Sequence, residues 1–398
     1  MQTVRPLGAR TTAHTIGITG SLRDASSGMR LDTVLLKVTS RCNINCSYCY
    51  VYHQGDTSWQ RMPKHMSLAT VEDVLKQLAK LYEDQQHPFA VVLHGGEPLL
   101  LPRNILEALL QGLADSLPAV CNRAIQTNGI LIDDDLLDLC VRTNTTLSVS
   151  LDGPADVNDT FRIAFNGGGT YARVVDGIDR IRQHPQGSRL FTGALCVVDP
   201  HSDARRVYEF FKSLGVPSVD FLFKDGNYEK LPPGKTAVES TEYGRWLAAV
   251  WDCYVNDPNP PRIRILDDFG RLLLGGASIK EGCGQTVYGI AVIDTDGTIT
   301  KNDTLKSTYD GADRFEKTWS VSNDRLSEVV SSSEFIRYSQ LQQPTSPVCQ
   351  ACPLLAVCGG GMPLSRWHPD TGLANPSVYC ADYKLLISHI HETLQDYR

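Results

Sequence analysis

Residues 33–49 read TVLLKVTSRCNINCSYC, and this stretch decides the fold. Its first seven residues are largely apolar and β-branched, which predicts a buried β-strand over 33–39. Three cysteines follow in the spacing C-x3-C-x2-C, at Cys42, Cys46 and Cys49. Clustered thiols of this kind more often bind metal or carry out redox chemistry than form disulfides. A metal site is therefore expected directly after the first strand.

The alternation of strand and helix continues for about 190 residues. Helical patterns alternate with apolar strands, which indicates a parallel sheet covered by helices. Six such units cannot close an eight-stranded barrel, so the sequence predicts an α/β fold with a partial (β/α)6 TIM-like barrel, whose chemistry lies at the C-terminal ends of the strands. The expected strands are 33–39, 89–94, 122–127, 146–151, 191–198 and 218–223, and the expected helices are 67–84, 103–116, 133–142, 171–184 and 201–214.

The pattern changes near residue 224, where KDGNYEKLPPGK is rich in turn formers. Helices are expected over 239–256 and 263–275, a hairpin around Asp296-Gly297, and a final helix over 381–396. The rest of the C-terminal part is expected to be loops, which need a metal for stability. The expected division is an N-terminal extension (1–32), the barrel (33–230), bridging helices (231–280) and a loop-rich cluster domain with the final helix (281–398).

Composition excludes several classes of protein. The 398 residues carry a net charge of −7 and no basic stripe that would follow a phosphate backbone, so nucleic acid is not an expected partner. No apolar run reaches the roughly 18 residues of a membrane span. The N-terminus has no apolar region followed by a small-residue cleavage site, so the sequence predicts a cytoplasmic protein without a membrane partner.

The twelve cysteines fall into three sets. Cys121, Cys140, Cys196 and Cys253 stand alone and are expected to be small core residues. A second set has C-x2-C-x5-C spacing, and structural zinc is an open alternative for it, because four thiolates complete a tetrahedral site. Its members are Cys349, Cys352 and Cys358, with Cys380 further on and Cys283 upstream. The first set has only three thiols and no adjacent His, which suits a four-iron cluster with one iron left open for a ligand.

The motifs together resemble the radical S-adenosylmethionine (SAM) enzymes over residues 33–385. C-x3-C-x2-C after the first strand and His94-Gly95-Gly96-Glu97-Pro98 at the end of the second are similar to signatures of that superfamily, and the C-terminal part resembles a SPASM domain. The stretches that most resemble bacterial peptide maturases, including those that form cyclophanes, are KVTSRCNINCSYCYVY, VLHGGEPLLL, IQTNG, VSLDGP, ALCVVDP and NPSVYCADYK.

The resemblance implies cofactors and the residues that hold them. Cys42, Cys46 and Cys49 would hold a [4Fe-4S] radical cluster, whose fourth iron binds SAM, and an electron donor such as flavodoxin or ferredoxin would reduce it. The residues expected to contact SAM are Tyr48, Gly95, Gly96, Glu97, Ser150 and Arg162. Each has an ordinary alternative when taken alone: GGEP as a strand-ending turn, and Arg162 as a surface ion pair.

The C-terminal part departs from the family pattern. Asn302 and Met362 stand where a full SPASM domain has cysteines. The resemblance therefore implies one auxiliary [4Fe-4S] cluster, held by Cys349, Cys352, Cys358 and Cys380, and a free or structural Cys283. Asp303 matches a catalytic base of the related sulfatase-maturing enzymes; the alternative is that Asp303 only caps the turn of TKNDTLK.

The expected function is that of a radical SAM peptide maturase. It would abstract a hydrogen from a ribosomally made precursor peptide and join an aromatic residue to the β-carbon of a nearby residue, forming a cyclophane. Oxidation of a sulfatase Ser or Cys to formylglycine is the alternative within the superfamily. A zinc-stabilised, non-enzymatic binding protein is the alternative of another class.

Overall fold

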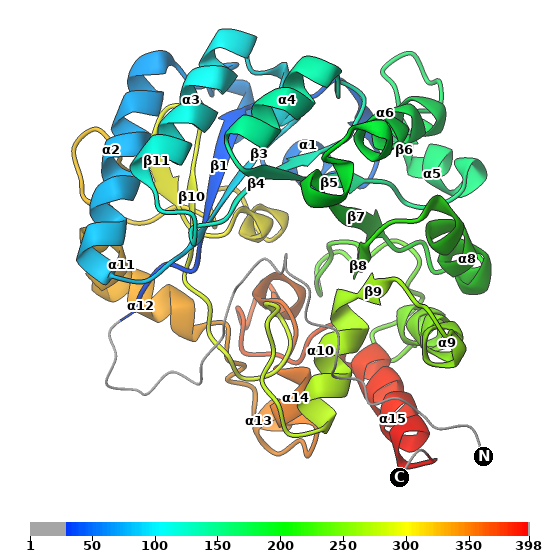
Figure 1. Cartoon of the computed structure of the whole chain (residues 1–398). Coiled ribbons are helices and arrows are strands. Elements are labelled where there is room, and N and C mark those ends of the chain that lie inside the picture. The colour runs from blue at the N-terminus through cyan, green and yellow to red at the C-terminus, as the bar shows by residue number, and fades with distance from the viewer. Residues whose placement is uncertain (1–28, 397–398) are drawn as a thin grey trace.

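A computed structural model describes residues 29–396, so residues 1–28 of the expected N-terminal extension lie outside the described residues. The core is a row of parallel strands in which every neighbour is also the next barrel strand along the chain (Figure 1). This confirms the α/β fold with a partial barrel. The strands are β1 (Thr33–Thr39), β3 (Ala90–Gly95), β4 (Arg123–Thr127), β5 (Thr145–Ser150), β7 (Phe191–Val197) and β8 (Ser218–Leu222).

Five helices predicted from the apolar spacing are present between these strands: α2 (Leu68–Gln85), α3 (Arg103–Ser116), α4 (Asp134–Arg142), α6 (Tyr171–Gln183) and α8 (Ala204–Leu214). Their boundaries follow local chemistry. Ser67 caps α2 by accepting the N–H of Thr70, Asp203 caps α8, and Gly215 ends α8 with a φ of 68°. Each helix turns an apolar stripe to the sheet, as Val71, Val74 and Leu78 do in α2.

The sheet extends beyond the predicted barrel at both ends. The short strand β9 (Arg262–Ile263) pairs with β8, and β10 (Ile290–Ile293) pairs in parallel with β1. The expected hairpin at Asp296-Gly297 is present, with β11 (Thr298–Thr300) antiparallel to β10 and followed by β12 (Trp319–Ser320). The C-terminal part of the chain is thereby joined to the first barrel strand in one ten-stranded sheet.

The bridging segment contains α9 (Glu242–Asn256) and α10 (Arg264–Leu273), and the final helix is α15 (Cys380–Asp396). A buried ion pair joins this segment to α15, because Lys235 Nζ lies 2.6 Å from Asp382 Oδ2. The other oxygen of Asp382 accepts the N–H of Gly244 at 2.8 Å. A Cβ at Gly244 would lie 2.6 Å from the Asp382 carbonyl oxygen, so α9 packs against α15 at this position only because it carries a glycine.

Before the final helix, most residues of the C-terminal part lie in loops and turns, as expected, but short helices that the sequence did not predict interrupt them. These helices are η3 (Asp303–Ser307), α11 (Leu326–Ser331), α12 (Ser333–Gln340), α13 (Pro347–Gln350), α14 (Leu355–Cys358) and η4 (Pro363–Arg366). The longest of these has eight residues, which is too short for a helical period to show in the sequence. The remaining short elements are β2 (Asn45–Cys46), α1 (Tyr50–His53), η1 (Ser58–Gln60), η2 (Pro98–Leu100), α5 (Ala155–Phe161), β6 (Arg162–Ile163) and α7 (Gly187–Leu190).

Among residues 29–396, no helix is both long enough and apolar enough to cross a lipid bilayer.

Candidate functional site

A cavity of about 580 Å³ is lined by residues from the C-terminal ends of the barrel strands and by residues of the C-terminal part. It brings together all the residues predicted for the radical cluster and for SAM, and it adds Asp303 from the C-terminal part. The predicted residues that line it are Cys42, Cys46, Tyr48, Cys49, Gly95, Gly96, Glu97, Ser150, Arg162 and Asp303. The four C-terminal cysteines lie around a different cavity.

The loop with the first three cysteines is held by the barrel on two sides. Its short strand β2 pairs with β6, which places Cys46 opposite Arg162. From the end of β4, Asn128 Nδ2 donates to Asn43 Oδ1 at 2.7 Å and lies 3.9 Å from Cys42 Sγ. None of the three thiols forms a disulfide. Three free thiols in one fixed loop are the donor set that an iron–sulfur cluster requires.

Gly95 and Gly96 allow the end of β3 to press against the segment that leads into Cys42. A Cβ at Gly95, whose φ is 131°, would lie 2.2 Å from the carbonyl oxygen of Thr39, and one at Gly96 would lie 2.2 Å from that of Arg41. Protein packing therefore requires both glycines. The expected approach of SAM to the same backbone stays a prediction.

Glu97 is almost fully buried, and its carboxylate is held in place by hydrogen bonds. Oε1 accepts the hydroxyl of Thr127 at 2.6 Å and the N–H of Leu99 at 3.0 Å, while Oε2 accepts the N–H of Asn128 at 2.8 Å. Burial outweighs these bonds and raises the pKa of Glu97 above its usual range. One lone pair of Oε2 has no partner in these bonds, which leaves room for the expected ammonium contact.

Tyr48 and Arg162 form a hydrogen-bonded chain with Asp152, a residue that the motifs in the sequence did not indicate. The Tyr48 hydroxyl donates to Asp152 Oδ2 at 2.7 Å and accepts from Arg162 Nη1 at 3.0 Å. Arg162 is 5% exposed, so the alternative that it forms a surface ion pair is wrong. Ser150, the last residue of β5, is another predicted SAM contact. Its hydroxyl oxygen accepts a hydrogen bond from Gln126 Nε2 at 2.9 Å.

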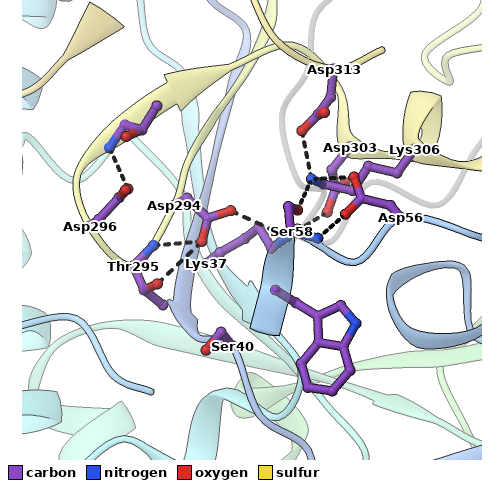
Figure 2. A network of polar contacts seen from close by, with 12 residues as sticks. Lys37, Ser40, Asp56, Ser58, Asp294, Thr295, Asp296, Asp303, Lys306 and Asp313 are labelled. Carbon is purple, nitrogen blue, oxygen red and sulfur yellow. Dashed lines mark hydrogen bonds and ion pairs between the residues drawn. The ribbon is translucent and has the colours of Figure 1, made fainter. Parts of the chain in front are cut away.

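Asp303 belongs to a buried ionic network that connects η3 to β1 (Figure 2). A hydrogen bond also joins it to α1. Lys37 Nζ lies 3.5 Å from Asp303 Oδ2 and 3.5 Å from Asp294 Oδ2. The Tyr50 hydroxyl donates to Asp303 Oδ2 at 3.1 Å. Burial opposes ionisation of Asp303, but the charges of Lys37, His94 and Lys306 outweigh it and hold the pKa of Asp303 below its usual range. The carboxylate is therefore ionised at neutral pH.

The explanation of Asp303 as a turn cap is wrong. The cap of η3 is Asn302, whose Oδ1 accepts the N–H of Thr304 at 3.1 Å and its hydroxyl at 3.0 Å. The side chain of Asp303 instead faces the cavity and the network. Lys37 was missed in the sequence, although a lysine within the apolar strand TVLLKVT is a signal of a buried, paired charge.

Two further acids line the cavity without a sequence signal. Asp225 follows β8, and burial, reinforced by the charge of Asp303, raises its pKa to about 7. Burial also raises the pKa of Glu281 to about 7, and Asn302 Nδ2 donates to its Oε2 at 3.1 Å. The cavity therefore holds Asp303, which is ionised at neutral pH, together with Asp225 and Glu281, which titrate near neutrality.

The positions that depart from the SPASM pattern lie in the wall of the same cavity as Cys283. Cys283 and Met362 both line it, together with Asn302. The Cys283 thiol lies 3.6 Å from Asp268 Oδ2 and forms no disulfide. A Cβ at Gly282 would lie 2.9 Å from Met362 Sδ, so the methionine packs directly against the Cys283 loop.

The four C-terminal cysteines surround a small cavity of about 30 Å³ formed by α13, α14 and the start of α15. They are Cys349, Cys352, Cys358 and Cys380, and none forms a disulfide. Arg366 is buried close to Cys349 and Cys358; burial lowers its pKa to about 10, so it remains a cation at neutral pH. Among residues 29–396, no three His, Cys, Asp or Glu side chains converge as around a single metal ion. A [4Fe-4S] cluster binds each thiolate through a different iron.

Replacing Lys37 with methionine is expected to destabilise the protein by about 3–5 kcal/mol, because it leaves Asp294 and Asp303 buried without their shared cation. Urea denaturation at pH 7 measures the effect. The pKa of Asp303 is lowered in the folded state, so the loss should shrink as pH falls below 3.8 and this carboxylate becomes protonated. Lys76→Met is the control, since that lysine is 64% exposed in its pair with Asp73. Equal stability of the Lys37→Met variant and the wild type would contradict the importance of this network.

Comparison with known proteins places the barrel in a family. Residues 36–228 match the family model of the Radical SAM superfamily. The protein is accordingly a radical SAM enzyme, which excludes the non-enzymatic zinc-binding alternative. Its cofactors are SAM and [4Fe-4S] clusters, and the three free thiols beside the cavity are a donor set that fits them.

Curated relatives resemble the chain over most of its length. A cysteine-type anaerobic sulfatase-maturating enzyme of Clostridium perfringens is 22% identical over 89% of this chain and 94% of its own length. A serine-type enzyme of Bacteroides thetaiotaomicron is 22% identical over 88% and 86%.

Solved structures share the fold. Native anSMEcpe with bound AdoMet has a TM-score of 0.76 at 21% identity, covering 92% of this chain and 98% of its own. SuiB of Streptococcus suis, bound to its precursor peptide SuiA, has a TM-score of 0.59 at 13% identity, covering 84% and 72%.

Proposed function

We propose that this radical SAM enzyme oxidises a side chain of a peptide, with Asp303 as the base. The observation that carries the proposal is the placement of an ionised carboxylate, Asp303, in the same cavity as Cys42, Cys46 and Cys49. A peptide residue that enters the cavity is then within reach of both the radical source and a proton acceptor. A cavity with strongly perturbed carboxyl groups is typical of an active site.

The cofactors, when bound, supply a radical that abstracts a hydrogen atom from an unactivated carbon. The chain's own residues hold and orient them. Cys42, Cys46 and Cys49 would bind three irons, while the six contact residues (Tyr48, Gly95, Gly96, Glu97, Ser150 and Arg162) would surround SAM. The proton that the oxidised peptide loses would pass to Asp303 Oδ2. Cys349, Cys352, Cys358 and Cys380 would hold an auxiliary cluster, and such a cluster would supply an acceptor for the surplus electron.

Formylglycine formation is the reaction that the comparisons favour. The relatives named anaerobic sulfatase-maturating enzymes align with this chain from the barrel to the C-terminal part. In this reaction the peptide Ser or Cys loses a hydrogen atom from its β-carbon, one electron, and the proton of its hydroxyl or thiol, which Asp303 would take. A positioned carboxylate that is ionised at neutral pH suits this step. With Cys the product of this step is a thioaldehyde, which water then hydrolyses to formylglycine with release of hydrogen sulfide.

Cyclophane formation is the second candidate, and aromatic side chains in the cavity wall support it. Phe223, Phe269, Tyr379 and Tyr383 line the cavity and pack against one another. Aromatic walls of this kind accept an aromatic side chain well, since ring pairs gain about 0.5–1.5 kcal/mol beyond burial. In this reaction Asp303 would take the proton that the ring loses when it regains aromaticity.

One experiment tests both reactions. The enzyme, reconstituted anaerobically with iron and sulfide, is incubated with SAM, a reductant and one of two peptides. The first is a sulfatase-derived peptide with Ser at the modified position, and the second is a peptide with an aromatic residue two positions before a polar one. Both products are lighter than the substrate peptide by two hydrogen atoms. Only the formylglycine product reacts with a hydrazide, and only the cyclophane resists fragmentation between the joined residues. SAM cleavage with neither product would contradict the proposal.

Iron content tests the proposed cluster number. One radical and one auxiliary [4Fe-4S] cluster correspond to about eight irons per chain, against about twelve for a full SPASM complement. We expect about eight, unchanged by Cys283→Ala, because the Cys283 thiol already lies against Asp268. Iron analysis of the reconstituted protein measures this. A value near twelve that falls in Cys283→Ala would show that a second auxiliary cluster binds despite Asn302 and Met362.

The physiological setting stays a prediction from the sequence: a peptide substrate and a flavodoxin or ferredoxin as electron donor, in the cytoplasm.

A further inference from the structure

Asp152 connects three separate parts of the barrel. It lies in the turn after β5 and is 3% exposed. Its Oδ2 accepts the hydroxyl of Tyr48 at 2.7 Å, and its Oδ1 accepts the backbone N–H of Val197, the last residue of β7, at 3.0 Å. The backbone of Asp152 is fixed as well, because its carbonyl oxygen lies 3.3 Å from the Cys196 thiol. Both carboxylate oxygens therefore hold fixed partners.

The Tyr48 hydroxyl connects Asp152 to Arg162 by hydrogen bonds. It donates to Asp152 and accepts from Arg162 Nη1 at 3.0 Å, so its orientation is set from both sides. Tyr48 lies between Cys46 and Cys49 in sequence, and Arg162 pairs with Cys46 across β2 and β6. The position of Asp152 thus governs two side chains that adjoin the cysteine loop.

Tyr48 and Arg162 line the cavity, whereas Asp152 lies behind them. Arg162 also has an unpaired hydrogen-bond donor, because its Nε is buried and has no hydrogen-bond partner among the described residues. A buried donor without a partner is costly, and a bound acceptor would satisfy it. We infer that Asp152 is a positioning residue, which holds Tyr48 and Arg162 in the orientation that binds SAM beside the radical cluster. The inference rests on the proposed site but not on the identity of the peptide.

Asparagine cannot replace the carboxylate at this position. Both partners of Asp152, the Tyr48 hydroxyl and the Val197 N–H, donate to it. The amide of asparagine has one acceptor oxygen, and its NH2 group would face the other donor. Asp152→Asn therefore releases either Tyr48 or the end of β7 while changing the side-chain volume little.

The test compares Asp152→Asn and Tyr48→Phe with the wild type, and Asp156→Asn is the matched control. Asp156 lies four residues further along, and its carboxylate pairs with Arg206 at the surface. The proteins are reconstituted anaerobically, and three quantities are measured without any peptide: iron content, SAM affinity by equilibrium dialysis, and the change that SAM produces in the electron paramagnetic resonance (EPR) spectrum of the reduced radical cluster.

We expect Asp152→Asn and Tyr48→Phe to keep the wild-type iron content but to bind SAM about ten- to a hundredfold more weakly, as residues that orient cluster-site groups do when replaced. The spectral change should be incomplete at the SAM concentration that saturates the wild type, and Asp156→Asn should behave as the wild type. Unchanged affinity and spectrum in both variants would overturn the inference. Loss of iron or of folding in both would also overturn it, because the role would then be structural only. Failure of the wild type to bind SAM would instead contradict the proposed site.

Discussion

Replacement of Cys42, Cys46 and Cys49 together by alanine is expected to abolish SAM cleavage while the visible absorbance of the auxiliary cluster remains. The two sets of cysteines lie around different cavities, one at the barrel mouth and one between α13, α14 and α15. Loss of the first set therefore leaves the second intact. The measurement is 5′-deoxyadenosine by chromatography, with absorbance recorded on the same sample.

The matched control replaces Cys121 and Cys140, two buried thiols of the barrel core, with alanine. These cysteines lie away from both cavities, so the control should retain SAM cleavage even if its stability falls. Deoxyadenosine formation by the triple variant at the wild-type rate would refute the assignment of the radical cluster. Loss of all visible absorbance in the triple variant would show that the two sites do not form independently.

Asp303→Asn is expected to continue cleaving SAM but to lose product formation by about 10²–10⁴-fold, which is the usual contribution of a general base. Asparagine keeps the shape and can still accept the Tyr50 hydroxyl, but it cannot take a proton. The measurement is the ratio of modified peptide to 5′-deoxyadenosine. This ratio should fall sharply in the variant, because cleavage and oxidation become uncoupled.

The pH dependence provides a second check on Asp303. The pKa of this carboxyl is held below 3.8, so its protonation should cause no loss of product as pH falls from 8 to 5. A fall of the product ratio near pH 7 would point instead to Asp225 or Glu281, whose pKa values lie at about 7. Product formation by Asp303→Asn at the wild-type rate would show that Asp303 is not the base.

The barrel could be predicted because its strands and helices are long enough to show their periods. The run at 33–39 and the apolar stripe of α2 both appear in the structure where the pattern places them. The short helices from residue 326 onward could not be found in this way. The pairing of β10 with β1 is a contact between residues about 250 positions apart, and no local pattern encodes it.

The candidate site, too, could be predicted from the sequence only in part. Motifs at strand ends predicted which residues meet at the barrel mouth, because the ends of parallel strands converge there. They did not reveal what those side chains contact. Asp152 was overlooked within VSLDGP, and Lys37 within the first strand, since a buried charge is recognised by its partner and the partners are distant in sequence. The choice between two peptide reactions depends on how side chains are placed around the cavity, which no spacing rule describes.

The parallel pairing of β1 with β10 bears on how this protein can be divided. Without residues beyond 230, the register from Thr33 to Leu36 would lose its partner, and the first barrel strand would present an open, apolar edge. Such edges template pairing between chains and lead to aggregation. The C-terminal part thus covers the edge of the barrel sheet, in addition to supplying the four cysteines of the proposed auxiliary site. Attempts to express the barrel alone should therefore keep β10 and β11, joined to it by a linker, rather than stop at the apparent domain boundary.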